Sequence, residues 1–459
     1  MEKNSSQFTK GSPGPIIAYY LELWAQKIDS YYIQSRETWD LEILQHRLDI
    51  ENTVNQTVIV DDEGDGDFTS IQQAINSVPS SSAILIYSGS YETPLVIDKP
   101  VWLIGISEEY KNGTDFGKPL LMNTPPFSEE STIEINAHNT TISGLNIESD
   151  YTAIQANYSD NLIIFENTIR VSKRGSAIYC KNCSGQIKEN MVFGSNISKN
   201  GLCLFSSSDL LAKANIFNHF QNALTVSNCN NVSIMSNTFS NSSDNGIFFS
   251  DGIINDTSFA KNNFINNNVH VAANSNVMFI NNSWTLNSVG NYWDTYEGVD
   301  VDKNGIGDDP YNIGDHIGLD FFPLIHEVKN HPPNVPIINV DETGILCGKT
   351  KENIPFFVTI DDEDGNNVSC KWLWGENHDS WDGPYRVPKT LSESNVWESN
   401  GKHIVSVYYI HALLKDDEGL TVSSEPYEIH IYDLSAIPNP FFRSIVDTFI
   451  PSYFLTGWN

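Results

Sequence analysis

The fold is decided by a run of similar units, three of which stand in succession as AIYCKNCSGQIKENMV (177–192), GLCLFSSSDLLAKANIF (201–217) and ALTVSNCNNVSIMSNTF (223–239). Apolar residues alternate with variable ones in each unit, which is the periodicity of a β-strand. Each unit also contains an Asn followed two residues later by an apolar residue, at Asn167, Asn190, Asn215, Asn237, Asn262 and Asn282. Successive Asn lie 23, 25, 22, 25 and 20 positions apart. This repeat length is typical of a solenoid.

No unit contains a helical pattern, so helical and leucine-rich repeats are excluded and a parallel β-helix remains. The predicted inward ladder is Ile178, Leu202, Leu224, Ile247 and Val269, with Cys180, Leu204, Val226, Phe249 and Val271 two residues further on. We expect the repeated Asn to stack at the corners of the coils. There Asn tolerates left-handed backbone, and its amide can bond the Asn of the next coil.

The segment before the repeats predicts a cap for the solenoid. Residues 58–76 (VIVDDEGDGDFTSIQQAIN) read as a strand, an acidic Gly-rich turn and a helix. Thr69 or Ser70 caps this helix, and Ile71, Ala74, Ile75 and Val78 share one face of it. An amphipathic helix at this position would cover the open hydrophobic end.

Both ends of the solenoid resemble known families. Residues 61–76, with GSY (89–91), IDKP (97–100) and LIG (103–105), resemble the start of pectin-lyase-like right-handed β-helices. Residues 290–311 and FFPL (321–324) resemble the terminal segment of NosD-type β-helix proteins. The resemblance covers about residues 57–325 and implies a right-handed parallel β-helix. It also implies three kinds of relative, namely periplasmic copper-site assembly proteins, surface proteins and polysaccharide enzymes, among which the fold does not choose.

The composition changes after this region. Pro332, Pro333 and Pro336 mark a linker, and the strand-turn-strand units of residues 356–365, 372–375, 401–407 and 415–420 resemble a PKD-like immunoglobulin β-sandwich. The predicted organisation is an N-terminal helical or extended segment (1–56), the β-helix (57–325), a Pro-rich linker (326–336), the PKD-like module (337–433) and an amphipathic C-terminal tail (434–459). Cys347 and Cys370 could form a disulfide inside this module.

Charge and composition limit the possible partners. The 26 basic and 58 acidic side chains give a net charge of −32, which excludes a nucleic-acid binder held by phosphate contacts. No apolar stretch is long enough to span a membrane. Residues 1–15 lack the apolar core of a signal peptide. Asn-x-Ser/Thr sequons such as Asn112, Asn139 and Asn255 nevertheless favour an extracellular or cell-surface glycoprotein.

One acidic turn predicts a calcium site. Asp300, Asp302, Asn304 and Asp308, with Gly305 at the sharp turn, match five positions of a Ca²⁺-binding loop. Tyr311 stands where the loop's last acid belongs, so Asp309 or Asp315 would have to replace it.

The outward positions of the repeats favour binding over catalysis. Tyr179, Phe205, Phe248 and His270 are expected on one strand face, where aromatic rings could stack on sugars. The outward rows considered contain no Asp or Glu, and Arg170 and Arg174 are expected to have no acidic Ca²⁺ cluster one coil away in register. The Cys180-x-x-Cys183 pair is expected to fill the core rather than to bind metal.

We therefore predict a surface protein without enzymatic activity that binds a polysaccharide, a glycoprotein or a neighbouring surface protein. One alternative is a polysaccharide lyase or glycoside hydrolase. The other is a periplasmic copper-site assembly protein, for which His270, Cys203, Met235 and Met278 are candidate soft ligands on different coils.

Overall fold

The computed structural model describes residues 54–107, 110, 115–122, 130–195, 197–314, 316–329, 331–340, 347–374, 378–398, 405–417, 419–433 and 435. These residues form two compact units, one ending at Lys329 and one following it. The predicted segment up to residue 53 and the predicted tail from residue 436 lie outside the described residues. No helix among the described residues is long and apolar enough to cross a membrane.

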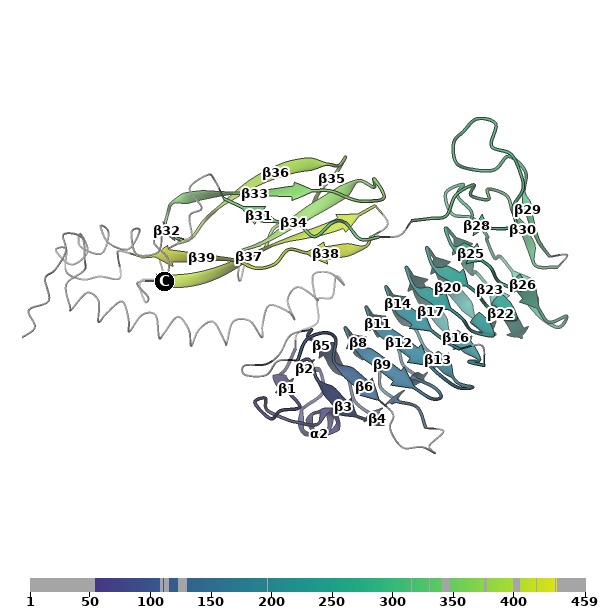
Figure 1. Ribbon diagram of the computed structural model, residues 1–459, viewed down its shortest axis with the longest axis horizontal. Helices are drawn as coiled ribbons and strands as arrows, with labels where there is room; N and C mark the ends of the chain where they lie inside the picture. Colours follow the sequence, from purple (N-terminus) through teal and green to yellow (C-terminus); the bar gives the residue numbers. More distant parts are fainter. Residues whose placement is uncertain are drawn as a thin grey trace, which may run out of the picture. The chain divides into compact units, whose positions relative to one another are not determined.

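Three parallel sheets build the first unit (Figure 1). Sheet 1 consists of β1 (Thr57–Val60), β2 (Ser82–Ile86), β5 (Val101–Gly105), β8 (Thr141–Ser143), β11 (Leu162–Phe165), β14 (Gly185–Lys188), β17 (Ser208–Lys213), β20 (Asn230–Met235), β23 (Ile253–Asn255), β27 (Met278–Ile280) and β24 (Ser258–Ala260), which also pairs with β20. Sheet 2 consists of β3 (Ser90–Glu92), β6 (Leu120–Met122), β9 (Asn146–Ser149), β12 (Thr168–Val171), β15 (Met191–Phe193), β18 (Ile216–Asn218), β21 (Thr238–Ser240), β25 (Asn263–Ile265) and β28 (Tyr292–Trp293). Sheet 3 consists of β4 (Leu95–Ile97), β7 (Ile133–Ile135), β10 (Ile154–Asn157), β13 (Ser176–Lys181), β16 (Asn200–Phe205), β19 (Asn222–Ser227), β22 (Asn245–Asp251) and β26 (Val269–Ala273).

The chain visits the three sheets in turn, so that each coil adds one strand to each sheet, except that β23 and β24 both join sheet 1. Equivalent residues of successive coils are direct partners, as Ile178 is of Leu202 and Leu202 is of Leu224. This arrangement is a parallel β-helix, which confirms the predicted fold class.

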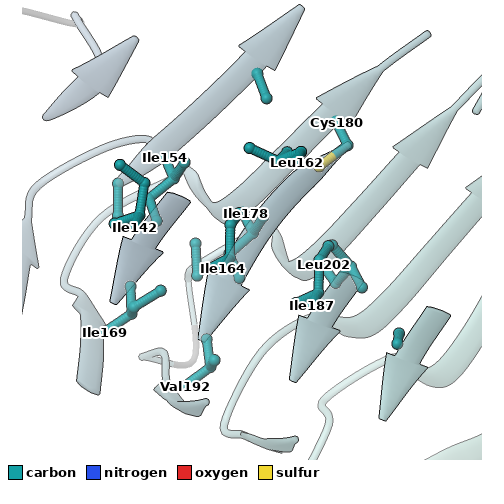
Figure 2. Packing of buried hydrophobic residues seen from close by; sticks show 14 of the residues in the cluster. Ile142, Ile154, Leu162, Ile164, Ile169, Ile178, Cys180, Ile187, Val192 and Leu202 are labelled. Carbon is teal, nitrogen blue, oxygen red and sulfur yellow. The ribbon is translucent and has the colours of Figure 1, made fainter. Parts of the chain in front are cut away.

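Apolar side chains from all three sheets fill the interior of the solenoid (Figure 2). Ile164 of sheet 1, Ile169 of sheet 2 and Ile178 of sheet 3 are fully buried in the same coil. Cys180 and Cys183 are also buried, which agrees with their predicted role as core residues.

A ladder of buried Asn side chains runs along the corner between sheets 1 and 2. The amide nitrogen of each Asn donates to Oδ1 of the Asn in the next coil, through Asn167, Asn190, Asn215, Asn237, Asn262 and Asn291. The predicted stacking is confirmed, with two corrections. Asn291 rather than Asn282 is the sixth rung, and the left-handed residue is the one before each Asn from Asn167 to Asn262, such as Ala214 with φ of 58°.

A carboxylate ends this ladder. Asp320 Oδ2 accepts hydrogen bonds from the backbone nitrogen of Asn291 at 2.7 Å, from its side-chain amide at 3.2 Å and from Trp293 Nε1 at 2.9 Å. Asp320 lies at the end of a short antiparallel pair, β29 (Tyr311–Gly314) and β30 (Gly318–Asp320). Burial outweighs these hydrogen bonds and raises the pKa of Asp320.

The N-terminal end carries the predicted helix, α2 (Ile71–Ser77). The Ser70 hydroxyl caps it by accepting a hydrogen bond from the Gln73 amide, and Ile71, Ala74 and Ile75 are buried. The helix packs against β1, β2 and β4. The cap predicted from the sequence is thus confirmed.

The second unit consists of two sheets that share a hydrophobic core. One sheet contains β31 (Ile338–Asn339), β33 (Asn353–Ile360) and β36 (Lys389–Val396). The other contains β32 (Cys347–Lys349), β39 (Tyr427–Tyr432), β37 (Val405–Asp416), β34 (Val368–Trp374), β35 (Asp382–Tyr385) and β38 (Thr421–Ser423). Phe356, Trp372 and Trp374 lie between the two sheets, as expected for an immunoglobulin-like sandwich.

Val328 shows why the first unit extends into the predicted linker. Its backbone nitrogen donates to Asn263 Oδ1 at 2.8 Å, and its carbonyl oxygen accepts from Asn263 Nδ2 at 2.9 Å. Residues 326–329 therefore belong to the first unit.

Candidate functional site

Three of the four predicted sugar-stacking residues lie on the outward face of sheet 3. Tyr179, Cys203, Thr225 and Phe248 are successive partners, so Tyr179 and Phe248 stand three coils, or ~14 Å, apart. Phe205 lies in the next outward row, opposite Lys181, whose Nζ is 6.0 Å from the centre of its ring. Glu134 precedes Gln155 in the row of Tyr179, so an acid stands one coil before the positions that were predicted to be free of acids.

His270 is not part of this face. Ile247 pairs with Val271 rather than with Val269, so the last coil is shifted by two residues from the predicted ladder. Val269 is exposed, whereas His270 is buried against Phe264 and Trp293. Its Nε2 lies 2.8 Å from Asp294 Oδ1, and burial, which outweighs the attraction of Asp294, lowers its pKa. The assignment of His270 to the glycan face was therefore wrong.

An open groove of about 490 Å³ lies on the outward face of sheet 2, over β6, β9, β12 and β15. Met122, Glu148, Arg170 and Phe193 follow one another in register along it, one per coil. This row therefore spans ~14 Å along the solenoid axis. Asp150, Ser172 and Ser195 also line the groove.

The row places a cation beside an aromatic ring. The guanidinium carbon of Arg170 lies 4.7 Å from the centre of the Phe193 ring, within the range of a cation–π interaction. A guanidinium beside an aromatic ring can still donate its N–H groups to hydrogen-bond acceptors. Together the two side chains offer one apolar surface and one set of hydrogen-bond donors.

Asp150 is ionised and held in place. Lys173 Nζ and Ser172 Oγ each donate to its carboxylate at 2.6 Å, and these two hydrogen bonds lower the pKa of Asp150. A general acid needs a raised pKa instead, so Asp150 is poorly suited to protonate a leaving group.

Glu148 is the direct partner of Arg170 one coil away, and this single acid was missed among the outward positions. The two residues are 22 positions apart, which is one repeat. The sequence signal was present, because Asn146-Ile-Glu148 aligns with Thr168-Ile-Arg170 when the repeat is extended one unit toward the N-terminus.

The predicted calcium loop forms a tight turn. The Asp300 carboxylate accepts from the backbone nitrogens of Asn304 and Gly305 at 3.1 and 2.9 Å, and Gly305 has a φ of +84°. Burial opposes ionisation of Asp300, but these hydrogen bonds outweigh it and lower its pKa. The carboxylates of Asp300, Asp302 and Asp308 do not gather around one point, since the only cluster of three acidic, His or Cys ligands among the described residues lies elsewhere. Calcium binding here remains a prediction.

The predicted disulfide does not fit the strand order of the second unit. Cys347 lies on β32 and Cys370 on β34, and β39 and β37 stand between these strands. Three strand spacings amount to ~14 Å, whereas the Cα atoms of a disulfide lie within about 7 Å. Cys370 is a buried free thiol whose pKa is raised to about 12 by burial. The disulfide prediction was therefore wrong.

The fold and the groove define the class of the first unit: a parallel β-helix with a charged and aromatic groove along one outward face. A family model described as "Periplasmic copper-binding protein (NosD)" matches residues 117–298. The resemblance to NosD-type β-helix proteins is thus confirmed over these residues.

No curated protein matches the chain. Among solved structures, the chain is similar to a periplasmic alginate epimerase, with 12% identity over 51% of this chain and 68% of that chain and a TM-score of 0.24. It is also similar to a tailspike protein, a capsular polysaccharide depolymerase, of the Acinetobacter baumannii bacteriophage Fri1, with 9% identity over 85% and 79% of the two chains and a TM-score of 0.27. The PKD domain of an M14-like peptidase from a Thermoplasmatales archaeon matches 23% of this chain and 98% of its own length, with 22% identity and a TM-score of 0.18. These likenesses say nothing about the activity of this chain.

Proposed function

We propose that this protein is an exported β-helix protein that binds an extended, uncharged polysaccharide in the groove of sheet 2. The observation that carries the proposal is the row of Met122, Glu148, Arg170 and Phe193, which follows the solenoid axis for ~14 Å. A linear glycan of about three sugar units would lie along such a row. Phe193 would stack on the apolar face of one sugar, while Glu148 and Arg170 would bond its hydroxyl groups.

The charges of the groove favour an uncharged ligand. The carboxylates of Glu148 and Asp150 are balanced by Arg170 and Lys173, whereas the chain as a whole carries a charge of −32. A polyanion would be repelled by this field at low ionic strength. An uncharged glycan would bind with little dependence on salt.

Binding is proposed rather than cleavage, because the lowered pKa of Asp150 keeps it ionised at neutral pH. Export is supported by the periplasmic character of the NosD family whose model matches residues 117–298. The same match would support copper binding. However, the described residues bring no three His or Cys side chains together, so the groove is the stronger candidate site.

The experiment is a screen of neutral polysaccharides and alginate against the purified chain, followed by calorimetric titration of the best binder. Arg170→Ala with Phe193→Ala should weaken binding by at least tenfold and leave the melting temperature nearly unchanged, because both side chains lie on the outward face. Ile216→Ala removes an exposed apolar side chain of the same sheet outside the groove and should bind as the wild type does.

The aromatic face of sheet 3 is the alternative site on the same molecule. Tyr179→Ala with Phe248→Ala should leave binding unchanged if the ligand lies in the groove. Loss of binding in this variant, with normal binding in the groove variant, would move the site to sheet 3. Release of unsaturated or reducing sugar ends during the titration would instead support the enzymatic alternative.

A further inference from the structure

The turn after β1 gathers three carboxylates at the N-terminal end of the β-helix. Asp61, Asp62 and Glu63 each present one oxygen, and these three oxygens lie within 4.8 Å of one another. No other group of three acidic, His or Cys ligands is this close in the described part of the chain. Like charges at such distances repel strongly unless something lies between them.

One carboxylate oxygen of Asp61 and one of Asp62 are enclosed without a hydrogen-bond donor. The Asp61 side chain is completely buried, and its Oδ2 accepts from the backbone nitrogens of Gly64 at 3.1 Å and Asp65 at 2.9 Å. Its Oδ1 is buried and has no hydrogen-bond partner. Asp62 repeats the pattern, because its Oδ2 accepts from the Ser90 nitrogen at 2.9 Å while its Oδ1 has no partner. A buried anionic oxygen is normally paired or bound to a metal.

The backbone of the neighbouring coil packs directly against the Asp62 carboxylate. Gly89 has a φ of +146°, and a Cβ atom at this position would lie 2.1 Å from Asp62 Oδ1. Any residue other than Gly would therefore displace the Asp62 carboxylate. The loop before β3 and the turn after β1 thus meet around the unpartnered oxygens.

We propose that Asp61, Asp62 and Glu63 bind one Ca²⁺ ion that joins the turn after β1 to the loop before β3. Ca²⁺ takes carboxylate oxygens at 2.3–2.6 Å, so two ligands of one ion are separated by at most about 5 Å. The observed grouping satisfies this limit. Mg²⁺ requires oxygens at 2.0–2.1 Å in near-octahedral geometry, which three acids from consecutive residues meet less readily. The ion would hold the capping helix α2 against the first coils.

The test uses the full chain carrying Asp302→Ala, so that the loop at Asp300–Asp308 does not contribute. After removal of metal with a chelator, Ca²⁺ is titrated by calorimetry, and thermal melts are recorded with Ca²⁺ and with chelator. We expect one bound ion and a rise in melting temperature of about 5 °C at saturation. Adding Asp61→Asn should abolish both the Ca²⁺ binding and the rise in melting temperature. Asn keeps an oxygen that accepts from the backbone nitrogens of Gly64 and Asp65, but it replaces the unpartnered oxygen with an amide nitrogen. Asp98→Asn makes the same chemical change at an exposed position outside the cluster and should alter neither result.

A second readout locates the ion. Tyr91 is buried close to the cluster, and burial together with the charges of Asp62 and Asp61 raises its pKa. Tb³⁺ bound in place of Ca²⁺ should therefore show tyrosine-sensitised emission that Tyr91→Phe removes and excess Ca²⁺ displaces. If Asp61→Asn prevents folding, Asp62→Asn and Glu63→Gln carry the same test. Equal Ca²⁺ binding with and without these substitutions, or no Ca²⁺ binding in the Asp302→Ala protein, would overturn the proposal.

Discussion

Replacement of Asn215 by Ala tests whether the Asn ladder stabilises the β-helix. Asn215 is fully buried, and its Oδ1 accepts from the backbone nitrogen of Asn190 at 3.0 Å and from its side-chain amide at 2.9 Å. Its own amide donates to the carbonyl oxygens of Ile187 and Lys213 and to Asn237 Oδ1. The variant would leave the buried Asn190 N–H without an acceptor, at a cost of about 1–3 kcal/mol, and would remove further bonds worth about 1 kcal/mol each. We expect a total loss of about 3–5 kcal/mol in the free energy of unfolding.

The assay is urea denaturation followed by circular dichroism and by the fluorescence of the tryptophans. Asn276→Ala is the matched control, because Asn276 is exposed and bonds only to the Asp251 side chain among the described contacts, so its loss should cost less than about 0.5 kcal/mol. Asn215→Asp separates hydrogen bonding from size. The Asp side chain keeps an acceptor for Asn190 but places a second acceptor opposite the Ile187 carbonyl oxygen and Asn237 Oδ1. At neutral pH this variant should therefore be at least as destabilising as Asn215→Ala. If Asn215→Ala costs no more than Asn276→Ala, the ladder does not stabilise the fold.

Two further predictions concern the C-terminal end of the β-helix. The first concerns Ca²⁺ binding by the loop at Asp300–Asp308, tested in a chain that carries Asp61→Asn. Ca²⁺ at one hundred times its Kd should stabilise this chain against unfolding by about 2.7 kcal/mol, and Asp302→Ala should abolish the stabilisation. Identical thermal melts with Ca²⁺ and with chelator would refute the prediction. Because the pKa of Asp320 is raised above its ordinary value of 3.8, the folded state holds this proton more tightly than the unfolded state. The stability of the wild type relative to Asp320→Asn should therefore fall as the pH rises above 3.8, and a pH-independent difference between their urea midpoints would contradict this.

The parts of the fold that repeat were predictable from the sequence, because each coil obeys the same local pattern. The inward ladder from Ile178 to Ile247 and the Asn ladder from Asn167 to Asn262 follow from a repeat of 22–25 residues. The pattern fails in the last coil, where Val271 replaces Val269 opposite Ile247. Val269 and Val271 are both apolar and two positions apart, so alternation alone does not show which valine pairs with Ile247.

The candidate site was harder to predict, because its residues are neighbours across coils rather than along the chain. Glu148 and Arg170 lie in register, yet each stands in a short strand of four residues. The cluster at Asp61 and Asp62 was visible as an acidic turn, but its burial depends on Gly89 and Ser90, which come from the next part of the coil. Side-chain burial of this kind follows from packing and not from spacing.

The end of the Asn ladder shows why the last rung differs from the others. An interior rung must accept from the coil before it and donate to the coil after it, which an amide does and a carboxylate cannot. Asp320 accepts hydrogen bonds from Asn291, from Trp293 and from the backbone nitrogen of Phe322, and none of these bonds requires it to donate. A carboxylate therefore suits the final rung of the ladder but not an interior rung. An Asp at an interior rung would place its second oxygen against the Oδ1 acceptor of the Asn in the next coil. The chain carries 58 acidic side chains, and this constraint explains why Asn occupies the ladder until its final step.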